Sequence, residues 1–399
     1  MNTDKLLPFI AGCLLSFACT PKADKAKSGG FPMPSDKDAT VLHVVPGQDT
    51  LKLSHLVKSI DLIPLETKPE SMFSTPATVC YEDGRFYILD RSFTNSIALI
   101  FNADGSFVGR IGAKGRGRGE YLNPNAIAID RKNRNVLIFD HSIDKMFRYG
   151  LDGKYISTTD LELDFVSFVV TDNAAYYQTS KYNHMNPDSS GYWVAEITAV
   201  MQDNPDSLIR YCQVNQEVYN PNKTYAFSFQ ELPFCRLSDS YTFHYEKSLN
   251  IFRIDQKTDQ ISVKYKIDFG DIGYKEDLAW LSNPDAREYK SKHPEEAGEV
   301  KDVVETDSLL LFKYWHNESP YMYALFKSKG ESVSGPFVND ILDYYPPFTT
   351  VIDGTTLSVL IPEVEYFESL HRDNVPINGL DKLDSPKYSD CPFLIIYHF

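Results

Sequence analysis

A unit of three predicted strands occurs twice in tandem, and it constrains the fold more than any other feature. Residues 85–111 and 135–159 each open with an apolar run that ends in an aspartate, Asp90 or Asp140. A polar turn, a second strand, an Asp-Gly pair and a third strand follow in both copies. The two aspartates lie 50 positions apart. A period of that size with several strands per unit is typical of a β-propeller blade.

Weaker copies of the unit continue to the end of the chain. Further strand sets are predicted at residues 165–214, 225–269 and 308–337, and at 349–361 together with 392–399. The last run, Pro392–Phe399, is apolar on both faces, as a strand covered on both sides should be. Ser59–Leu65 is the N-terminal run that can pair with it. We therefore predict an all-β fold, a six-bladed β-propeller with a short helical insertion, closed by both ends of the chain.

Charge limits the partners of the protein. The formal net charge is −15, and aromatic residues make up 13% of the chain, which suits strands better than helices. Nucleic-acid binding normally needs a basic surface, so we expect no nucleic-acid partner. An acidic surface is also repelled by anionic lipid, so we expect membrane contact only through a lipid anchor.

The N-terminus has the pattern of an export signal. An apolar run of 13 residues, 6–18, follows Lys5 and precedes Cys19. The run is too short to span a bilayer but fits a secretory signal, and Ala18-Cys19 resembles a lipoprotein cleavage site. We predict a signal peptide at 1–19 with lipidation at Cys19, a flexible linker at 20–40 and the propeller at 41–399. The expected location is the cell envelope, anchored by lipid in the outer membrane, with the leaflet left open. The alternative is ordinary cleavage that leaves Cys19 free.

Four cysteines follow the signal segment, and none has metal-ligand spacing. They are Cys80, Cys212, Cys235 and Cys391. They could form disulfides in an exported protein, or they could be buried thiols in strands. We favour buried thiols, because a closed propeller does not need disulfides to hold its core.

One long segment departs from the strand pattern. Residues 273–306 are charged and poor in β-branched residues until Val300. We predict a helical insertion, interrupted at Asn283-Pro284 and at His293-Pro294. The segment is either a lid over one face of the propeller or a loop that decorates its rim, and we favour the rim.

Three stretches resemble a known family. SIDLIPLET near the start, IGAKGRGRGEYLNPNAIAID (Ile111–Asp130) between two blades, and the apolar C-terminal strand are similar to the six-bladed β-propeller lipoproteins of Bacteroidota. Asn125–Ile156 also resembles one NHL repeat. The resemblance covers nearly the whole mature chain and implies the fold, but no reaction. Arg118 stands where the family often has Pro, and the repeat signal weakens after residue 165.

The glycine-rich stretch between the two clear repeats has two interpretations. Gly112, Gly115, Gly117 and Gly119 alternate with Lys114, Arg116 and Arg118. Their backbone N–H groups could hold an anion. We favour the alternative that the glycines provide positive φ in a long connection. The stretch is neither a P-loop nor a dinucleotide fingerprint, because the required residues and the following helix are missing.

The polarity of the repeat predicts which loops share a face. If each blade runs outward from the axis, the Asp-Gly turns lie on one face, and the turns after Asp90 and Asp140 lie on the other. We predict a ligand-binding rim on that second face. Its candidate residues are Arg91, Arg116, Arg118, Asn125 and His141. Asp90 and Asp140 themselves should accept hydrogen bonds from their own turns.

Two functions of different class remain open. The first is a non-catalytic binding or scaffold lipoprotein, monomeric, that presents one propeller face to a glycan, a peptide or an envelope protein. The second is a hydrolase or lyase of the lactonase-like propeller type, with a divalent metal in the channel. No catalytic motif occurs and the nine histidines are scattered. We favour binding without a cofactor. A divalent metal stays possible, because a site formed by residues of several blades is not visible in one sequence.

Overall fold

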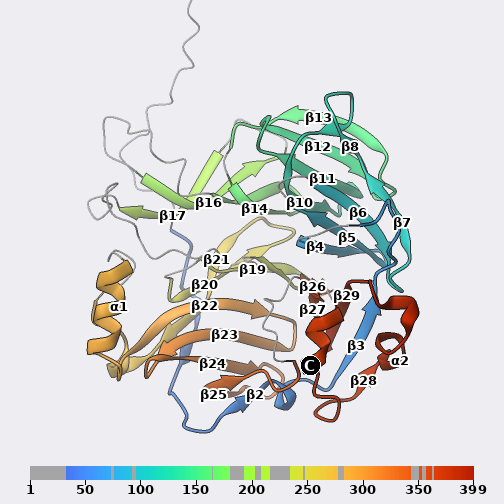
Figure 1. The fold of residues 1–399 in the computed structure, drawn as a ribbon. Coiled ribbons are helices and arrows are strands. Elements are labelled where there is room, and N and C mark those ends of the chain that lie inside the picture. The colour runs from blue at the N-terminus through green and yellow to red at the C-terminus, as the bar shows by residue number, and fades with distance from the viewer. Residues whose placement is uncertain are drawn as a thin grey trace, which may run out of the picture. The chain divides into compact units, whose positions relative to one another are not determined.

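The computed structural model describes most of the chain after residue 32. The described residues are 33–72, 76–91, 96–163, 165–179, 193–202, 208–215, 234–245, 248–276, 283–342, 350–352, 356–361 and 364–399. Their strands form six sheets of four or five strands around one axis (Figure 1). This is the predicted six-bladed β-propeller. The predicted signal peptide, Cys19 and most of the linker lie outside the described residues.

Blades 1 to 3 are four-stranded antiparallel sheets whose strands follow chain order. Blade 1 contains β4 (Pro76–Glu82), β5 (Arg85–Asp90), β6 (Ile97–Asn102) and β7 (Phe107–Ile111). Blade 2 contains β10 (Pro124–Asp130), β11 (Asn135–Asp140), β12 (Lys145–Gly150) and β13 (Tyr155–Asp160). Blade 3 contains β14 (Phe165–Val170), β15 (Ala174–Thr179), β16 (Trp193–Met201) and β17 (Leu208–Asn215).

Blades 4 and 5 each gain a fifth strand from the N-terminal segment. Blade 4 contains β18 (Phe234–Arg236), β19 (Ser240–Phe243), β20 (Asn250–Asp255) and β21 (Ile261–Asp268). Blade 5 contains β22 (Ala297–Glu305), β23 (Leu309–His316), β24 (Ser319–Phe326) and β25 (Glu331–Val338). β1 (Thr40–His43) pairs in parallel with β21, and β2 (Leu51–Lys52) pairs in parallel with β25. Neither added strand was predicted, because runs this short carry no periodicity of their own.

Blade 6 closes the ring with both ends of the chain, as predicted. It contains β26 (Thr350–Ile352), β27 (Thr356–Ile361), β29 (Phe393–His398), β3 (Ser59–Pro64) and β28 (Ile377–Asn378). β29 pairs with β3 in antiparallel register from Phe393↔Pro64 to His398↔Ser59. The apolar C-terminal strand is thus covered on both sides, and pairing with β3 removes the edge that an open ring would expose.

The predicted helical insertion is shorter than expected. Among the described residues, helix α1 covers Asn283–Lys292. It contains the first X-Pro pair, because Pro is tolerated in the first helical turn, and it ends before the second. Residues 297–305 are not helical but form β22, the innermost strand of blade 5. That part of the prediction was wrong. The remaining short elements are η1 (Leu53–His55), β8 (Ala113–Lys114), β9 (Glu120–Tyr121), η4 (Gly270–Ile272), η6 (Val364–Ser369), α2 (Leu380–Leu383) and η7 (Pro386–Tyr388).

The blades pack face to face around the axis. The first strands of the blades contact one another, so they are the inner strands. All six residues of β11 are buried. Val136 and Ile138 pack with blade 1, whereas Leu137 and Phe139 pack with blade 3. A strand buried on both faces needs apolar residues at successive positions, which explains the continuous apolar runs in the sequence.

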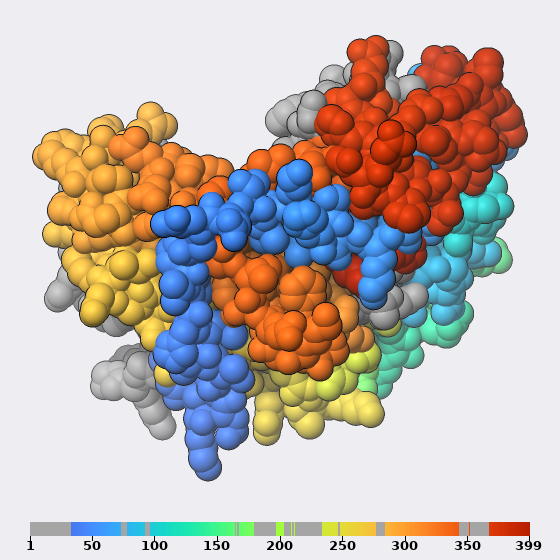
Figure 2. Space-filling model, turned by 90° about the horizontal axis from the view of Figure 1, so that it is seen from below, coloured from blue at the N-terminus to red at the C-terminus, as the bar shows by residue number. Residues whose placement is uncertain are grey.

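The two ends of the axis differ. We call the end where inner strands begin the insertion face and the end where they finish the turn face. Helix α1 directly precedes β22, and residues 364–392 lie between the second and third strands of blade 6, so both insertions belong to the insertion face. Figure 2 shows the two insertions as separate lobes, gold-orange and red, with the surface hollowed between them. The blue N-terminal segment crosses the orange blade 5 (Figure 2).

At the periphery the Asp104-Gly105 and Asp152-Gly153 turns each pack on the preceding blade. Gly105 has φ +86, and a Cβ there would lie 2.0 Å from the carbonyl oxygen of Pro64, at the end of β3. Gly153 has φ +81, and its Cβ would lie 3.0 Å from the oxygen of Arg110, on β7. Because the sheets twist, the end of the outer strand of one blade lies against the Asp-Gly turn of the next blade. The distinction between the two faces therefore holds near the axis and is lost at the rim.

Candidate ligand-binding face

The glycine-rich loop between blades 1 and 2 is filled by its own glutamate. The N–H of Gly117 donates to Oε2 of Glu120 over 2.8 Å. A Cβ at Gly115 would lie 1.9 Å from the same oxygen. Gly119 has φ +74 and lies against Tyr155. The carboxylate of Glu120 occupies the place where an anion would bind. Gly112 and Gly119 have positive φ, as in the interpretation we favoured, whereas Gly115 and Gly117 do not and instead make room for this carboxylate.

Arg118 lies away from the predicted rim. Its guanidinium carbon is 5.3 Å from the ring centroid of Tyr155, two residues beyond the Asp152-Gly153 turn of blade 2. His141 is at the other end of that blade, because Lys145 pairs with Asp160 at one end of β12 and Tyr149 with Tyr155 at the other. The prediction that Arg118 shares a rim with His141 was wrong. Strand polarity was read correctly, but the twist of the blades carries the loop toward the neighbouring Asp-Gly turn.

Asn125 and His141 do lie together on the insertion face. The Oδ1 of Asn125 accepts the backbone N–H of His141 over 3.0 Å. The imidazole of His141 is half exposed, and its Nδ1 lies 3.8 Å from Oδ1 of Asp144. Arg91 and Arg116 are exposed as well. Whether any of these residues contacts a ligand stays a prediction.

Asp140 holds the backbone around Asn125 and His141 in place by accepting hydrogen bonds, which is the structural role we expected. Its Oδ1 accepts the N–H of Ser142 over 2.9 Å, closing the turn after β11. Its Oδ2 accepts the N–H groups of Leu122 and Asn123 over 2.6 and 2.8 Å. One buried carboxylate thus holds the incoming loop and the turn together. Asp90 is also buried, but residues 92–95 of its turn lie outside the described residues.

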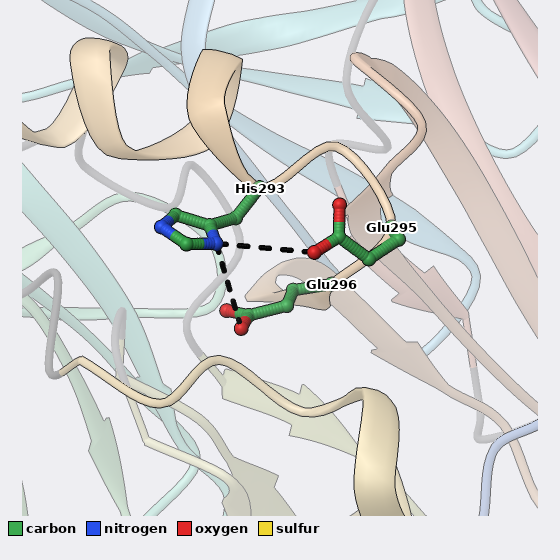
Figure 3. A group of neighbouring side chains, drawn as sticks. All are labelled: His293, Glu295 and Glu296. Atoms are coloured by element: carbon green, nitrogen blue, oxygen red, sulfur yellow. Dashed lines mark ion pairs between the residues drawn. The ribbon is translucent and has the colours of Figure 1, made fainter.

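A second group on the insertion face was not predicted. His293, Glu295 and Glu296 follow helix α1 and converge so that their ligand atoms lie within 4.8 Å of one another (Figure 3). The Nδ1 of His293 is 3.8 Å from Glu295 and 4.0 Å from Glu296. Among the described residues it is the one set of three side chains suited to a metal ion. The His-Pro-Glu-Glu run after a helix was the available signal, which we read only as a helix end.

The carboxylate of Glu296 already accepts hydrogen bonds from neighbouring residues. Its side chain is 9% exposed. The Oε2 atom accepts the hydroxyl of Tyr289 over 2.6 Å and the N–H of Lys275 over 3.3 Å. All three candidate ligands come from one loop, whereas a metal centre in the channel would draw ligands from several blades. The group therefore connects α1 to the start of blade 5, whatever else it binds.

Inner strand β22 carries two bulges, which sequence reasoning also missed. Its pairing with β23 slips between Gly298 and Lys301 and again between Lys301 and Val304. Glu299 and Asp302 have φ values of +57 and +49, where side chains are strained by about 1–2 kcal/mol each. A bulge redirects the side chains beside it.

The carboxylates of Glu299 and Asp302, beside the two bulges, form ion pairs with lysines. Glu299 lies 2.7 Å from the Nζ of Lys290, on α1, and 2.7 Å from that of Lys301. Burial raises the pKa of Glu299, but hydrogen bonds from these two lysines outweigh it and hold the pKa below its usual value. Asp302 pairs with Lys313 over 2.7 Å. The bulges thus tie helix α1 to the inner strand of blade 5.

At the turn face, three inner strands end in a carboxylate, and each carboxylate is bound by side-chain cations. Glu82 meets Arg131 over 2.5 Å and Arg236 over 3.4 Å. Asp130 meets Arg148 over 3.2 Å. The third carboxylate belongs to Glu305, the last residue of β22.

Glu305 is fully buried between two lysines. Lys264 and Lys327 lie 2.8 and 2.5 Å from its Oε1. Burial raises the pKa of Glu305, but the charges of the two lysines outweigh that effect and lower the pKa below its ordinary value. The negative charge of each carboxylate is already balanced by an Arg or Lys. Glu82, Asp130 and Glu305 therefore do not fit a shared metal site in the channel.

The cysteines whose side chains are described are free thiols. Cys235 and Cys391 are buried, and Cys80 is partly exposed. Burial raises the pKa of Cys80 to about 11 and that of Cys235 to about 12. The preference for thiols over disulfides is confirmed for these three. The side chain of Cys212, on β17, lies outside the described side chains.

The family match decides what the chain is related to. Residues 39–398 match the family described as Domain of unknown function (DUF4934). The chain belongs to this family. A comparison with curated proteins found no match. No helix among the described residues is long and apolar enough to cross a membrane.

Solved structures of other proteins are similar to this chain. A "Putative exported protein" of Bacteroides fragilis is similar over 91% of this chain and 99% of its own, with 16% identity and a TM-score of 0.64. A DUF4221 member of Bacteroides vulgatus covers 86% and 96%, with 11% identity and a TM-score of 0.47. A "putative gluconolactonase" covers 87% and 97%, with 9% identity and a TM-score of 0.39. The first of these structures has the same fold as this chain.

Proposed function

We propose that this chain is an exported, non-catalytic binding protein of the cell envelope that presents its insertion face to a glycan, a peptide or a protein partner. The observation that carries the proposal is that the carboxylates at the ends of three inner strands are already paired with positively charged side chains. Glu82, Asp130 and Glu305 end three inner strands, and each is bound by Arg or Lys. Acids in such pairs support the fold and are not available as general bases or metal ligands.

The insertion face is the working face in this proposal. It carries α1, residues 364–392, Asn125 and the half-exposed His141. Long insertions placed on one end of a rigid scaffold are where binding residues concentrate. Uronic or sulfated glycans and acidic peptides remain the ligand classes, since an anionic group is steered toward local cations on an acidic protein.

Binding can be tested with defined polymers. We would measure retardation of the purified full chain in native gels containing polygalacturonate, chondroitin sulfate or neutral dextran. His141→Glu on the insertion face should reduce retardation by an acidic polymer. Arg134→Glu, at the opposite end of the same strand β11, is the matched control and should not. Equal effects of both substitutions, or no retardation by any polymer, would count against the proposal.

The proposal includes export and a lipid anchor at Cys19, with residues 1–19 as signal and 20–40 as tether. The apolar run before Cys19 is too short to span a bilayer, so stable attachment needs acyl chains. Cys19→Ser should release the protein from membranes or leave the unprocessed precursor. Identical processing and membrane fractionation of the variant and the parent would rule out lipidation.

The alternative, a metal-dependent hydrolase or lyase of the lactonase type, has one observation in its favour. His293, Glu295 and Glu296 form a set that could hold a divalent ion. Elemental analysis of the purified chain separates the two functions. Stoichiometric metal that is lost in His293→Ala would support the alternative. Metal below about one-tenth equivalent after incubation with Zn²⁺ or Ca²⁺ would exclude this site at the affinities typical of protein metal centres.

A further inference from the structure

The first described residues of the chain run along the outside of the propeller, and we call residues 33–58 the strap. Within the strap, β1 pairs in parallel with β21 and ends with His43 beside Asp268. Ahead of β1, the carbonyl oxygen of Ser35 accepts the N–H of Val263 over 2.8 Å. The strap therefore reaches blade 4 beside the first residues of β21 and follows that strand to its end.

The strap is packed closely against blades 4 and 5. Leu42 and Val44 are buried in a hydrophobic cluster that contains residues of both blades. Further along, the N–H of Gly47 donates to the carbonyl oxygen of Ser334, on β25, over 3.1 Å. A Cβ at Gly47 would lie 2.3 Å from that oxygen. Backbone lies directly on backbone here, so the point where the chain joins the propeller is fixed by the fold.

The strap begins on the side of the propeller opposite the two insertions. The strands of blade 4 alternate in direction, so its fourth strand, β21, runs from the turn face toward the insertion face. Because β1 is parallel to β21, the strap runs the same way. In Figure 2 the start of the blue segment projects at the bottom, whereas the gold-orange and red insertions lie at the top. The residues before Ser35 therefore join the propeller from the side of the turn face.

The length of the proposed tether limits how an anchored propeller can turn. Ser35 is 16 residues after Cys19. A flexible chain of that length has an end-to-end distance of about 20–24 Å. The strand β21 has 8 residues, so the path along it is about 26 Å long. To bring the insertion face to the bilayer, the tether would have to stretch beyond its ordinary length along the side of blade 4.

We infer that the anchored propeller stands on the bilayer with its turn face toward the lipid and its insertion face toward the aqueous phase. A partner of the insertion face is then a molecule of the aqueous phase, and not a lipid or a membrane-embedded segment. The inference rests on the lipid anchor at Cys19 proposed above and adds a direction to it. With a net charge of −15, the protein surface has no attraction to anionic lipid that would override the tether.

Energy transfer to the membrane measures the orientation. The full chain, with a donor fluorophore on Arg134→Cys or His141→Cys, is extracted from membranes and reconstituted into phosphatidylcholine vesicles that contain an acceptor lipid. The two positions flank opposite ends of β11, and both parent side chains are exposed by more than half. Transfer should be more efficient from position 134, on the turn face, than from position 141, on the insertion face. The parent chain, treated with the same fluorophore, gives the background from native cysteines.

Equal transfer from the two positions, or more transfer from position 141, overturns the inference. Mass spectrometry of the N-terminal peptide from the same sample separates this outcome from a failure of the anchor. Acyl chains on Cys19 with reversed transfer would reject the orientation and leave the anchor, whereas a peptide without acyl chains would reject both. Cys19→Ser added to the same vesicles should give no transfer from either position. Transfer in that variant would mean that the protein surface itself binds lipid, which also overturns the inference.

A longer tether tests whether the starting point of the strap sets the direction. Inserting about 30 Gly and Ser residues after residue 24 raises the expected end-to-end distance of the tether to about 35–40 Å. The difference in transfer between positions 134 and 141 should then shrink, because the tether can pass along the side of blade 4. The same residues added after Phe399 are the matched control and should leave the difference unchanged. An undiminished difference with the long tether would overturn the role of the strap.

Discussion

His398 and Asp61 join the two ends of the chain: Nε2 of His398 lies 2.9 Å from Oδ2 of Asp61, across the β29–β3 pair. The other oxygen of Asp61 accepts from Nδ2 of Asn378 over 2.7 Å. Burial raises the pKa of Asp61, but these hydrogen bonds and the charges of His398 and Lys382 outweigh it, so the pKa lies below its usual value. One strand from the N-terminal part of the chain and two from its C-terminal part thus share one carboxylate at the closing seam of the propeller.

Removal of the seam should abolish cooperative folding. Deleting residues 392–399 takes away β29 and leaves one edge of β3 and one edge of β27 unpaired in the middle of blade 6. Circular dichroism melting should then show no sigmoidal transition. Deleting residues 20–40 should lower the midpoint but keep the transition, since it removes only contacts such as the Ser35–Ser262 bridge. A truncated protein that melts like the parent would contradict the role of the seam.

Gly105 should tolerate a side chain far less well than Gly84. Both residues have positive φ, +86 and +71, so alanine is strained at either by about 1–2 kcal/mol. A Cβ at Gly84 would meet nothing within 4 Å, whereas one at Gly105 would lie 2.0 Å from the carbonyl oxygen of Pro64. Gly105→Ala should therefore lower the free energy of unfolding clearly more than Gly84→Ala in urea titrations. Equal losses would mean that the contact between blades 1 and 6 is not tight there.

His244 should make the protein sensitive to mild acid. It is buried, with Nε2 3.0 Å from the carbonyl oxygen of Ser248. Burial lowers the pKa of His244 from 6.5 to about 4. Below about pH 6.5 the unfolded chain therefore binds this proton while the folded chain does not, until the pH falls to about 4. Stability is retained above pH 6.5 and lost as the pH falls to about 4, by about 3 kcal/mol in total.

The measurement for His244 is urea unfolding as a function of pH. His244→Gln cannot titrate and can still donate to Ser248, so its free energy of unfolding should fall less steeply below pH 6.5 than that of the parent. His55→Gln, at an exposed position, is the control and should follow the parent. If the curves of parent and His244→Gln are parallel over this range, His244 is not the group that titrates.

The arginines of the glycine-rich loop should separate into one that contributes to stability and one that does not. Arg118→Glu removes the guanidinium from the ring of Tyr155 and should lower the free energy of unfolding by about 0.5–1 kcal/mol. Arg116 is exposed, and Arg116→Glu should leave the melting temperature unchanged. If the loop steers an anionic polymer, both changes should weaken its binding at low salt to a similar degree. Loss of binding in Arg118→Glu alone would indicate a direct contact instead.

Local pattern was enough to predict the blades that follow the repeat and the seam that closes the ring. The runs ending in Asp90 and Asp140, the Asp-Gly turns and the apolar 392–399 are sequence signals, and they occur as strands and turns in the structure. Asp140 also has the turn-closing role that its position indicated. Strand β22 was missed because two bulges at Glu299 and Asp302 interrupt its alternation.

The sequence by itself determined the kind of fold, since a repeat of apolar strands can bury both faces only by stacking blade on blade into a closed ring. Tertiary structure decided which side chains meet. The twist of the blades moved Arg118 to Tyr155, away from His141. Ring closure brought Glu82 to Arg236, 154 positions apart. Such pairs depend on how whole blades are placed around the axis, and no local pattern in the chain encodes a contact across it.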